Sequence, residues 1–333
     1  MRKKKLAFLL GITPNLSFAA GNVALGINKY MSHDDYDIVI YYTELPAHDI
    51  AAFSNIPHVK LRQFNLPDEF VDTMLNKMPD TSRFKSKTHL MCFCHFEVFP
   101  LLDEYENVAW IDADTGIQGD LAGICEFAPF GITPDTPWTV GDQFSVPIGE
   151  YRMDVPGHCT AVMVVGDALP YKQIYKFLYE RAVQYADRLK NPDQAIMSIM
   201  LQEFGITPNL MDAGVWQCIS WRDEALAARV VHFGTEQKVW NNTNICNAFP
   251  EWYRTHLQWL ALGGSDFDRS AITPRNARGA LDYLDKLTSD ACKKHKKTCY
   301  LFGFVPVYRI KSCGKKSWHL LLSIVPFLRV KES

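Results

Sequence analysis

The sequence lacks the patterns that most directly assign a protein to a functional class. Its nine cysteines form no CxxC pair and follow no regular spacing, which argues against a disulfide framework or a structural zinc site and favours reduced, cytoplasmic thiols. No segment reaches the roughly 18 apolar residues of a membrane-spanning helix. Neither GxGxxG nor GxxxxGK followed by Ser or Thr occurs, which disfavours nucleotidyl- and phosphotransferases that rely on a glycine-rich phosphate loop.

The N-terminus resembles a signal peptide, with basic residues at 2–5, an apolar run and small residues at 19–20. We favour the alternative, that residues 6–12 belong to a first buried strand. The run is only seven residues long and Pro14 closes it, as expected for a strand followed by a ligand-binding turn.

Composition indicates one large α/β domain with an appendage. The chain has 333 residues, of which 47% are hydrophobic and 22% charged, so it is an ordinary globular protein. The net charge of -2 hides an asymmetry: residues 291–333 hold ten Lys or Arg and one acidic residue, whereas residues 1–290 hold 25 basic and 36 acidic residues. The tail should therefore bind anionic surfaces, and the acidic body should not bind nucleic acid.

Hydrophobic periodicity predicts the order of elements. Strands are expected at 5–12, 37–42 and 57–61, and helices at 18–31 and 46–54, which is the βαβ rhythm of a sheet with helices on both faces. Further predictions are a helix over 86–105, a strand ending at Asp112, strands at 138–140 and 161–165, a helix over 171–189 and a helix capped by Asp193. We predict one domain over 1–265 and a separate basic, aromatic region over 266–333.

The most informative motif follows the predicted strand that ends in Trp110-Ile111. Asp112 and Asp114 come next, two residues apart, so their side chains can share one face at the carboxyl edge of the sheet. Paired carboxylates suit Mn²⁺ or Mg²⁺ holding a diphosphate. Asp-x-Asp occurs three times, but the other two copies lie in polar segments. The alternative is a turn that caps the next element.

The basic tail contains an internal repeat, with residues 301–311 resembling residues 321–331. Each copy is a short apolar segment with a basic end, and aromatic residues lie nearby. Such a region can insert at a membrane interface with its cations toward lipid headgroups, so we predict that 292–333 binds an anionic membrane surface. A C-terminal hairpin packed on the body is the alternative.

Three motifs in order resemble glycosyltransferase family 8, whose members are retaining enzymes of GT-A fold that use nucleotide-sugar donors, such as bacterial lipopolysaccharide galactosyl- and glucosyltransferases. They are the Asp-x-Asp of WIDAD, the Asp-Gln pair at 193–194, and His232-x-Gly234-x-x-x-Lys238-x-Trp240. The resemblance spans roughly residues 5–245. It implies an α/β GT-A fold, a mixed Rossmann-like sheet flanked by helices that binds a nucleotide-diphospho-sugar.

The resemblance also implies roles for individual residues. Asp112 and Asp114 correspond to the metal and ribose ligands, His232 to the third ligand of Mn²⁺, and Lys238, with Gly234 beside it, to the diphosphate contact. Uridine would lie at the position held here by Gly11, Ile12, Thr13 and Asn15. Asp142, Asp193 and Gln194 would serve catalysis around the donor sugar. The chain departs from the family at Thr13, at Cys159-Thr160-Ala161 in the sugar pocket and at His95, which stands near the place of a phosphate-binding arginine.

Together these features predict transfer of glucose or galactose, with retention, from a UDP-sugar to a hydroxyl of a growing cell-surface glycan such as lipopolysaccharide, lipooligosaccharide or capsule. The expected cofactor is Mn²⁺ (or Mg²⁺), and the expected partners are the donor, a lipid-linked or oligosaccharide acceptor and the inner face of the cytoplasmic membrane. Two alternatives remain: a catalytically weak or inactive relative that binds sugar or membrane, and a metal-dependent nucleotidyltransferase.

Overall fold

The computed structural model describes residues 3–80, 82, 84–234 and 238–267, and the backbone of 297–301, 305–309 and 328–332. The chain divides into two compact units, one made of residues 1–240 and 245–268, the other of residues 241–244 and 269–333. The proposed domain boundary at 265 stays a prediction.

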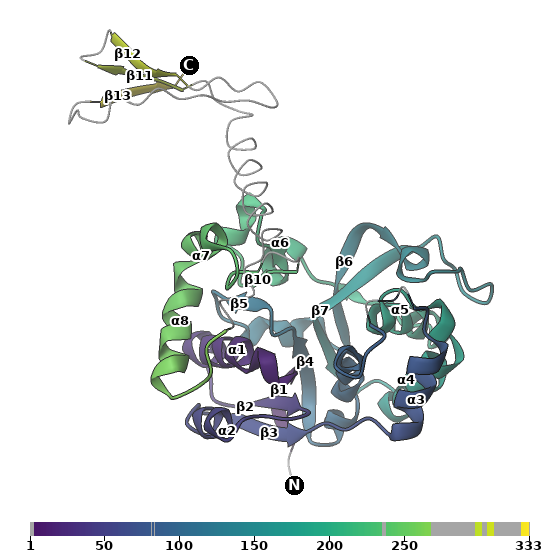
Figure 1. The fold of residues 1–333 in the computed structure, drawn as a ribbon. Coiled ribbons are helices and arrows are strands. Elements are labelled where there is room, and N and C mark those ends of the chain that lie inside the picture. Colours follow the sequence, from purple (N-terminus) through teal and green to yellow (C-terminus); the bar gives the residue numbers. More distant parts are fainter. Residues whose placement is uncertain are drawn as a thin grey trace. The chain divides into compact units, whose positions relative to one another are not determined.

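A mixed seven-stranded sheet forms the centre of the first unit, as Figure 1 shows. The strand order is β3 (Val59–Gln63), β2 (Tyr36–Tyr42), β1 (Lys4–Ile12), β4 (Tyr105–Ile111), β7 (Pro156–Gly166), β6 (Phe130–Thr139) and β8 (Asn209–Leu210). The first four strands are parallel, and β7 runs antiparallel to both β4 and β6. The central strands are buried on both faces, which explains their nearly continuous apolar sequence. The predicted mixed α/β sheet is confirmed.

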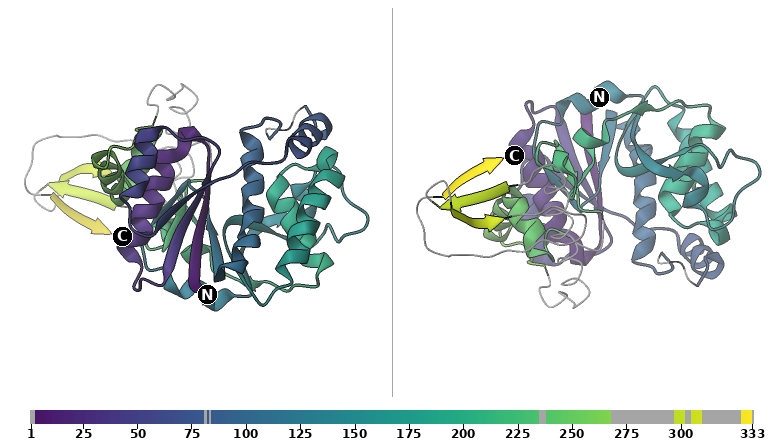
Figure 2. Two further views of the ribbon diagram at one scale, coloured as in Figure 1. Left: turned by 90° about the horizontal axis from the view of Figure 1, so that it is seen from below. Right: turned by 90° about the horizontal axis from the view of Figure 1, so that it is seen from above.

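Helices cover both faces of this sheet (Figures 1 and 2). On one side lie α1 (Ser17–Tyr30), α2 (Ala47–Ser54) and α8 (Pro250–Ala261), and on the other lie α3 (Asp68–Lys77), α4 (Tyr171–Gln184) and α5 (Pro192–Glu203). Two shorter helices, α6 (Ala213–Trp216) and α7 (Thr243–Ala248), follow α5 along the chain. Within the described part of the chain, every helix is too short or too polar to cross a bilayer.

Three predicted elements differ from the structure. The helix over 86–105 is two 3₁₀ helices, His89–Val98 and Pro100–Asp103, and Pro100 lacks the N–H that one continuous helix would need there. The strand predicted at 138–140 is the end of β6, which stops at Thr139, because Val140–Gln143 form a 3₁₀ turn whose capping box joins Thr139 to Asp142. Asp193 lies inside the first turn of α5, and the N-cap of that helix is Asn191.

A small second sheet brings a distant part of the chain next to the end of β4. It consists of β5 (Thr115–Ile117), β10 (Val230–His232) and β9 (Cys218–Ile219), in that order. In the antiparallel pairing of β5 and β10, His232 lies opposite Thr115. Two further backbone hydrogen bonds lock the pairing, from Phe233 N to Asp114 O at 2.9 Å and from Gln118 N to Arg229 O at 2.8 Å. This sheet therefore places His232 beside the residues that follow β4.

The carboxyl ends of β1 and β4 are neighbours at the edge where the strand order reverses. The chain adds β2 and β3 on one side of β1 and then crosses to β4 on the other side. Leu9 pairs with Trp110, so Gly11–Thr13 and Asp112–Asp114 leave the sheet at the same edge. Open α/β sheets bind their ligands at such a switch point.

The second unit contains a three-stranded antiparallel sheet in the order β12 (Val305–Arg309), β11 (Lys297–Leu301) and β13 (Leu328–Glu332). The two copies of the sequence repeat supply β12 and β13, and both pair with β11 rather than with each other. Most of 266–333 lies outside the described residues, so the membrane-binding role of 292–333 stays a prediction.

Candidate metal centre

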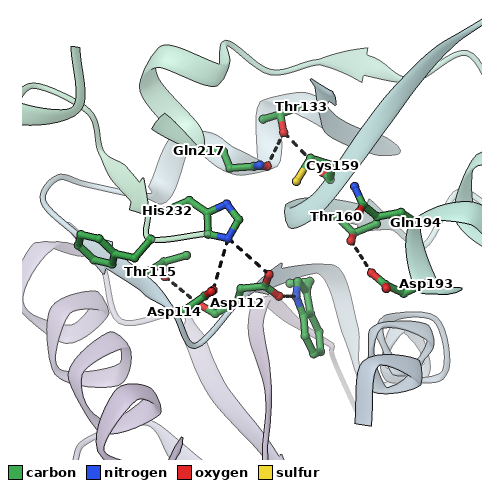
Figure 3. A network of polar contacts seen from close by, with 12 residues as sticks. Asp112, Asp114, Thr115, Thr133, Cys159, Thr160, Asp193, Gln194, Gln217 and His232 are labelled. Carbon is green, nitrogen blue, oxygen red and sulfur yellow. Dashed lines mark hydrogen bonds and ion pairs between the residues drawn. The ribbon is translucent and has the colours of Figure 1, made fainter. Parts of the chain in front are cut away.

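Two aspartates that are close in sequence and one distant histidine converge beyond β4. His232 Nε2 lies 3.4 Å from Asp114 Oδ1 and 4.0 Å from Asp112 Oδ2, and the candidate ligand atoms of all three residues lie within 4.8 Å of one another. Figure 3 shows the imidazole pointing toward both carboxylates. Asp112 and Asp114 lie in the turn that joins β4 to β5, and the pairing of β5 with β10 supplies the histidine.

The arrangement fits a divalent cation. The ligands of an octahedral ion with bonds of about 2.1 Å lie roughly 3–4 Å apart, which is close to the two distances from His232. Two carboxylates and an imidazole can together hold a divalent cation, and three protein ligands leave other positions of an octahedral ion open. Residues 112, 114 and 232 are therefore the ones that would hold the ion.

Lys238 completes the charge balance of this cluster. Its ammonium forms an ion pair with Asp114 and donates a hydrogen bond of 2.7 Å to the carbonyl oxygen of Phe233. Burial alone would raise the pKa of Asp114, but the positive charges of His232 and Lys238 outweigh it and hold that pKa well below its usual range. Conversely, burial would lower the pKa of His232, and the carboxylate of Asp114 outweighs it, so the pKa of the imidazole is raised.

Gly234 makes room for the imidazole. A Cβ atom at this position would lie 2.5 Å from His232 Cε1 and 2.8 Å from Nε2, which is far inside normal contact distance. The glycine of the predicted diphosphate motif thus has a steric reason in this structure: it lets the ring lie against the backbone two residues later.

Trp110 holds the carboxylate of Asp112 with a hydrogen bond, and Gly11 leaves room for its indole ring. The indole Nε1 donates a hydrogen bond of 2.6 Å to Asp112 Oδ1, and Thr115 Oγ1 donates one of 2.8 Å to the carbonyl oxygen of Asp112. A Cβ atom on Gly11 would lie 2.8 Å from the ring of Trp110, so the end of β1 must be glycine for the indole to reach this place. Trp110 was predicted only as part of a buried strand, and its role as a donor was missed.

His95 joins the metal cluster to Asp193. Its Nε2 lies 3.3 Å from Asp112 Oδ1 and 3.7 Å from Asp193 Oδ2, and its ring stacks on Trp110 at 3.8 Å between centroids. Burial would lower the pKa of His95, but the charges of Asp193 and Asp112 outweigh it and raise that pKa. Since Nδ1 contacts the carbonyl oxygen of Cys92 at 2.7 Å, the protonated ring can donate on both sides.

Asp193 and Gln194 lie in the first turn of α5, next to β7. Thr160 Oγ1 donates a hydrogen bond of 2.6 Å to Asp193 Oδ2 (Figure 3). Gln194 Nε2 donates one of 2.9 Å to the carbonyl oxygen of His158. Beside them, Thr133 on β6 donates a hydrogen bond to Gln217, and both side chains are buried. This side of the site is built from β6, β7 and α5, whereas the metal cluster is built from β4 and β10.

The other predicted residues are placed as follows. Gly11 and Ile12 end β1, and Thr13 Oγ1 donates a hydrogen bond of 2.7 Å to Asn15 Oδ1 just after it, at the same edge as Asp112. Asp142 accepts hydrogen bonds of 2.8 Å from both the backbone N and the Oγ1 of Thr139, and these bonds hold its pKa below the usual range. Its carboxylate therefore serves the turn, and its assignment to the sugar pocket stays a prediction.

Sequence reasoning missed one carboxylate, Asp135 on β6. It is half-buried, and Gln194, His232 and Asp142 are the side chains that influence its pKa. Burial raises the pKa of Asp135 more than Gln194 and His232 lower it. The signal in the sequence is the pair of prolines in TPDTPW, since proline interrupts the ladder of a sheet and marks a bulge or an edge.

Comparison with known proteins shows likeness in fold without likeness in sequence. No family model and no curated protein matches the chain. Among solved structures, the apo form of the bifunctional glycosyltransferase WbbM matches at a TM-score of 0.57 and 14% identity, covering 86% of this chain and 52% of WbbM. The galactosyltransferase LgtC, in complex with donor and acceptor sugar analogues, matches at 0.56 and 14%, covering 83% of this chain and 100% of LgtC.

A third match is the apo form of the glycosyltransferase GlyE from Streptococcus pneumoniae TIGR4, with a TM-score of 0.51, 11% identity, and coverage of 81% of this chain and 66% of that one. This chain thus spans about half the length of WbbM and the whole of LgtC. The mixed seven-stranded sheet flanked by helices is the GT-A fold of these glycosyltransferases.

Proposed function

We propose that this protein is a metal-dependent glycosyltransferase that moves a sugar from a nucleotide-diphospho-sugar to a hydroxyl group of a glycan. The observation that carries the proposal is the convergence of Asp112, Asp114 and His232 at the switch point of a GT-A sheet. Hard oxygen ligands, an imidazole and a neighbouring lysine suit a cation together with a diphosphate. The edge of β1, at Gly11–Asn15, is the proposed place of the nucleoside.

The finer proposal follows the family resemblance. The donor is a UDP-hexose carrying glucose or galactose, the cation is Mn²⁺ or Mg²⁺, and the configuration at the anomeric carbon is retained. The acceptor is a growing cell-surface glycan. The chemistry that the cation supplies when bound is neutralisation of negative charge on the leaving diphosphate.

Four further residues near the metal cluster have separate proposed roles. Lys238, paired with Asp114, places an ammonium where it can also meet diphosphate oxygens, and Gly234 keeps the imidazole of His232 in line with the carboxylates. Gln194, held by the carbonyl oxygen of His158, lies close to the reacting sugar, and Asp193, held by Thr160, orients sugar hydroxyls. The hydrogen bonds of these side chains hold them in place before substrate binds. Electrostatic stabilisation of a transition state requires such preorganised groups.

The proposed reaction uses attack from the same face as departure. The bond from the anomeric carbon to the diphosphate oxygen breaks, the acceptor oxygen forms the new glycosidic bond, and the departing diphosphate takes the proton of the acceptor hydroxyl. The protein supplies charge and orientation and no covalent nucleophile. Two carboxylates at the about 5–5.5 Å separation of retaining hydrolases are not part of the proposal.

The test is release of UDP from purified protein incubated with a panel of UDP-sugars, with Mn²⁺ or with EDTA. We expect Mn²⁺-dependent release that disappears in the double variant Asp112→Asn, Asp114→Asn. The matched control is Asp34→Asn, Asp35→Asn, which removes two exposed carboxylates from a loop before β2. Full turnover in the first double variant would refute the metal assignment.

The same assay separates the alternatives. A catalytically inactive relative would bind UDP and Mn²⁺ without releasing UDP from any sugar, and a nucleotidyltransferase would release diphosphate or a nucleoside monophosphate instead. Association of 292–333 with the inner face of the cytoplasmic membrane is part of our proposal for how a lipid-linked acceptor is met.

A further inference from the structure

A four-residue bulge interrupts β6 beside the candidate site. Pro134 pairs with His158 and Thr139 pairs with Pro156, so residues 135–138 on β6 lie opposite Gly157 alone on β7. A Cβ atom on Gly157 would lie 3.1 Å from the carbonyl oxygen of Thr139, so the partner strand is closely packed here. Bulges of this kind redirect side chains next to functional sites.

The bulge begins with a carboxylate, Asp135, next to the strand position that contacts Gln194. His158, whose carbonyl oxygen accepts the hydrogen bond of Gln194, pairs with Pro134, and Asp135 is the next residue. Both Gln194 and His232 are close enough to Asp135 to lower the pKa of its carboxyl group. The register of β6 and β7 therefore places Asp135 near the α5 side of the site, where Gln194 contacts His158.

The bulge ends with an exposed tryptophan. Trp138 is 54% exposed, although a tryptophan buries more apolar surface than most side chains when a core is available. Exposed aromatic residues beside a polar site are typical of ligand contacts, because the flat ring offers apolar area and loses little conformational entropy on binding. One face of a pyranose ring presents C–H groups to such a surface, while its hydroxyls need acceptors such as a carboxylate.

We propose that Asp135 and Trp138 form the subsite for the acceptor glycan, taking one hexopyranose ring with its C–H face on Trp138 and a hydroxyl donating to Asp135. This inference rests on the proposed glycosyltransferase function. The donor diphosphate belongs at the metal cluster on β4 and β10, so the ring that enters from solvent along β6 is the acceptor. Trp138 and Asp135 bind and position this sugar, and neither bonds to it covalently.

The test is saturation-transfer difference NMR on the full chain with UDP and Mn²⁺, using the methyl β-pyranosides of glucose and galactose and the methyl α-pyranoside of mannose as probes. We expect at least one probe to bind, Trp138→Ala to weaken its binding about tenfold or more, and Asp135→Asn to weaken it less. Tyr253→Ala is the control, because Tyr253 is an aromatic residue 39% exposed on α8. Thermal melting in the absence of probe establishes that each variant is folded.

The outcomes separate this inference from the function on which it rests. Binding of UDP with Mn²⁺ but of no pyranoside, or pyranoside binding that survives Trp138→Ala, would overturn the subsite and leave the proposed function standing. Pyranoside binding that is lost in Trp138→Ala while UDP and Mn²⁺ fail to bind would support the subsite and overturn the donor chemistry. Loss of binding in the Tyr253 variant as well would also overturn the subsite.

Discussion

Replacing Gly234 by alanine should weaken metal binding strongly while changing the stability of the protein little. The new Cβ atom would lie 2.5 Å from His232 Cε1 and 2.8 Å from His232 Nε2. Gly234 is not among the residues with positive φ, so alanine meets no backbone strain there. The imidazole must therefore move, because it is the end of a side chain and the backbone of β10 is fixed by its pairing with β5.

The size of the effect follows from these distances. Carbon atoms in normal contact lie about 3.5 Å apart, so the ring must retreat by about 1 Å. Metal–ligand distances tolerate about 0.2 Å, and residues that orient a ligand typically change metal affinity about 10- to 100-fold when they are replaced. A shift of one side chain at a partly open site should cost less than about 1 kcal/mol of unfolding free energy.

Isothermal titration with Mn²⁺ measures the affinity, and thermal melting without metal measures the stability. Gly149→Ala is the matched control, because a Cβ atom there would meet nothing within 4 Å. We expect weakened Mn²⁺ binding in the Gly234 variant alone and similar melting temperatures in both variants. Wild-type Mn²⁺ affinity in Gly234→Ala would show that His232 does not contact the ion from its position in this structure.

Three other predictions concern the site and the tail. Trp110→Phe should weaken Mn²⁺ binding about tenfold, since the smaller phenyl ring cannot donate the 2.6 Å hydrogen bond that Trp110 makes to Asp112; unchanged affinity would contradict this role. The pKa of His232 is raised above 6.5, so in metal-free protein its ion pair with Asp114 contributes stability that is complete below 6.5 and lost as pH rises through the raised value. Because Mn²⁺ replaces that proton, it should raise the melting temperature more above the raised pKa than below 6.5, and an opposite trend would exclude His232 as a ligand. Deletion of 292–333 should release the protein from anionic liposomes in a cosedimentation assay and leave donor hydrolysis intact. Unchanged cosedimentation would show that the tail does not bind the membrane.

The parts of the fold predicted well are those with strong local signals. The strand predicted at 5–12 is Lys4–Ile12 and the one at 37–42 is Tyr36–Tyr42, because a fully buried parallel strand is a short apolar run between turns. The same signal placed Asp112 and Asp114 at the end of β4. The approach of His232 to them depends on the pairing of β5 with β10, which local patterns do not encode, and only the spacing of His232 and Lys238 suggested it.

The residues that were missed owe their positions to partner strands. Residues 138–140 were predicted only as a strand, and the bulge opposite Gly157, which leaves Trp138 exposed, was not foreseen. Asp135, which stands between two prolines, was not singled out, and its neighbour Gln194 comes from a helix almost sixty residues later in the sequence. Register across a sheet is set by both strands together, so a single strand read alone cannot reveal it.

The pairing of β5 with β10 also has a consequence for the order in which the protein matures. A chain that has left the ribosome only as far as α5 carries both aspartates, but the histidine that faces them has not yet emerged. Tight capture of the cation must therefore wait until residue 232 has been synthesised and has docked. Once captured, the ion would link two segments that are far apart in the sequence. Partial unfolding that detaches β10 should therefore release the ion before the rest of the sheet unfolds.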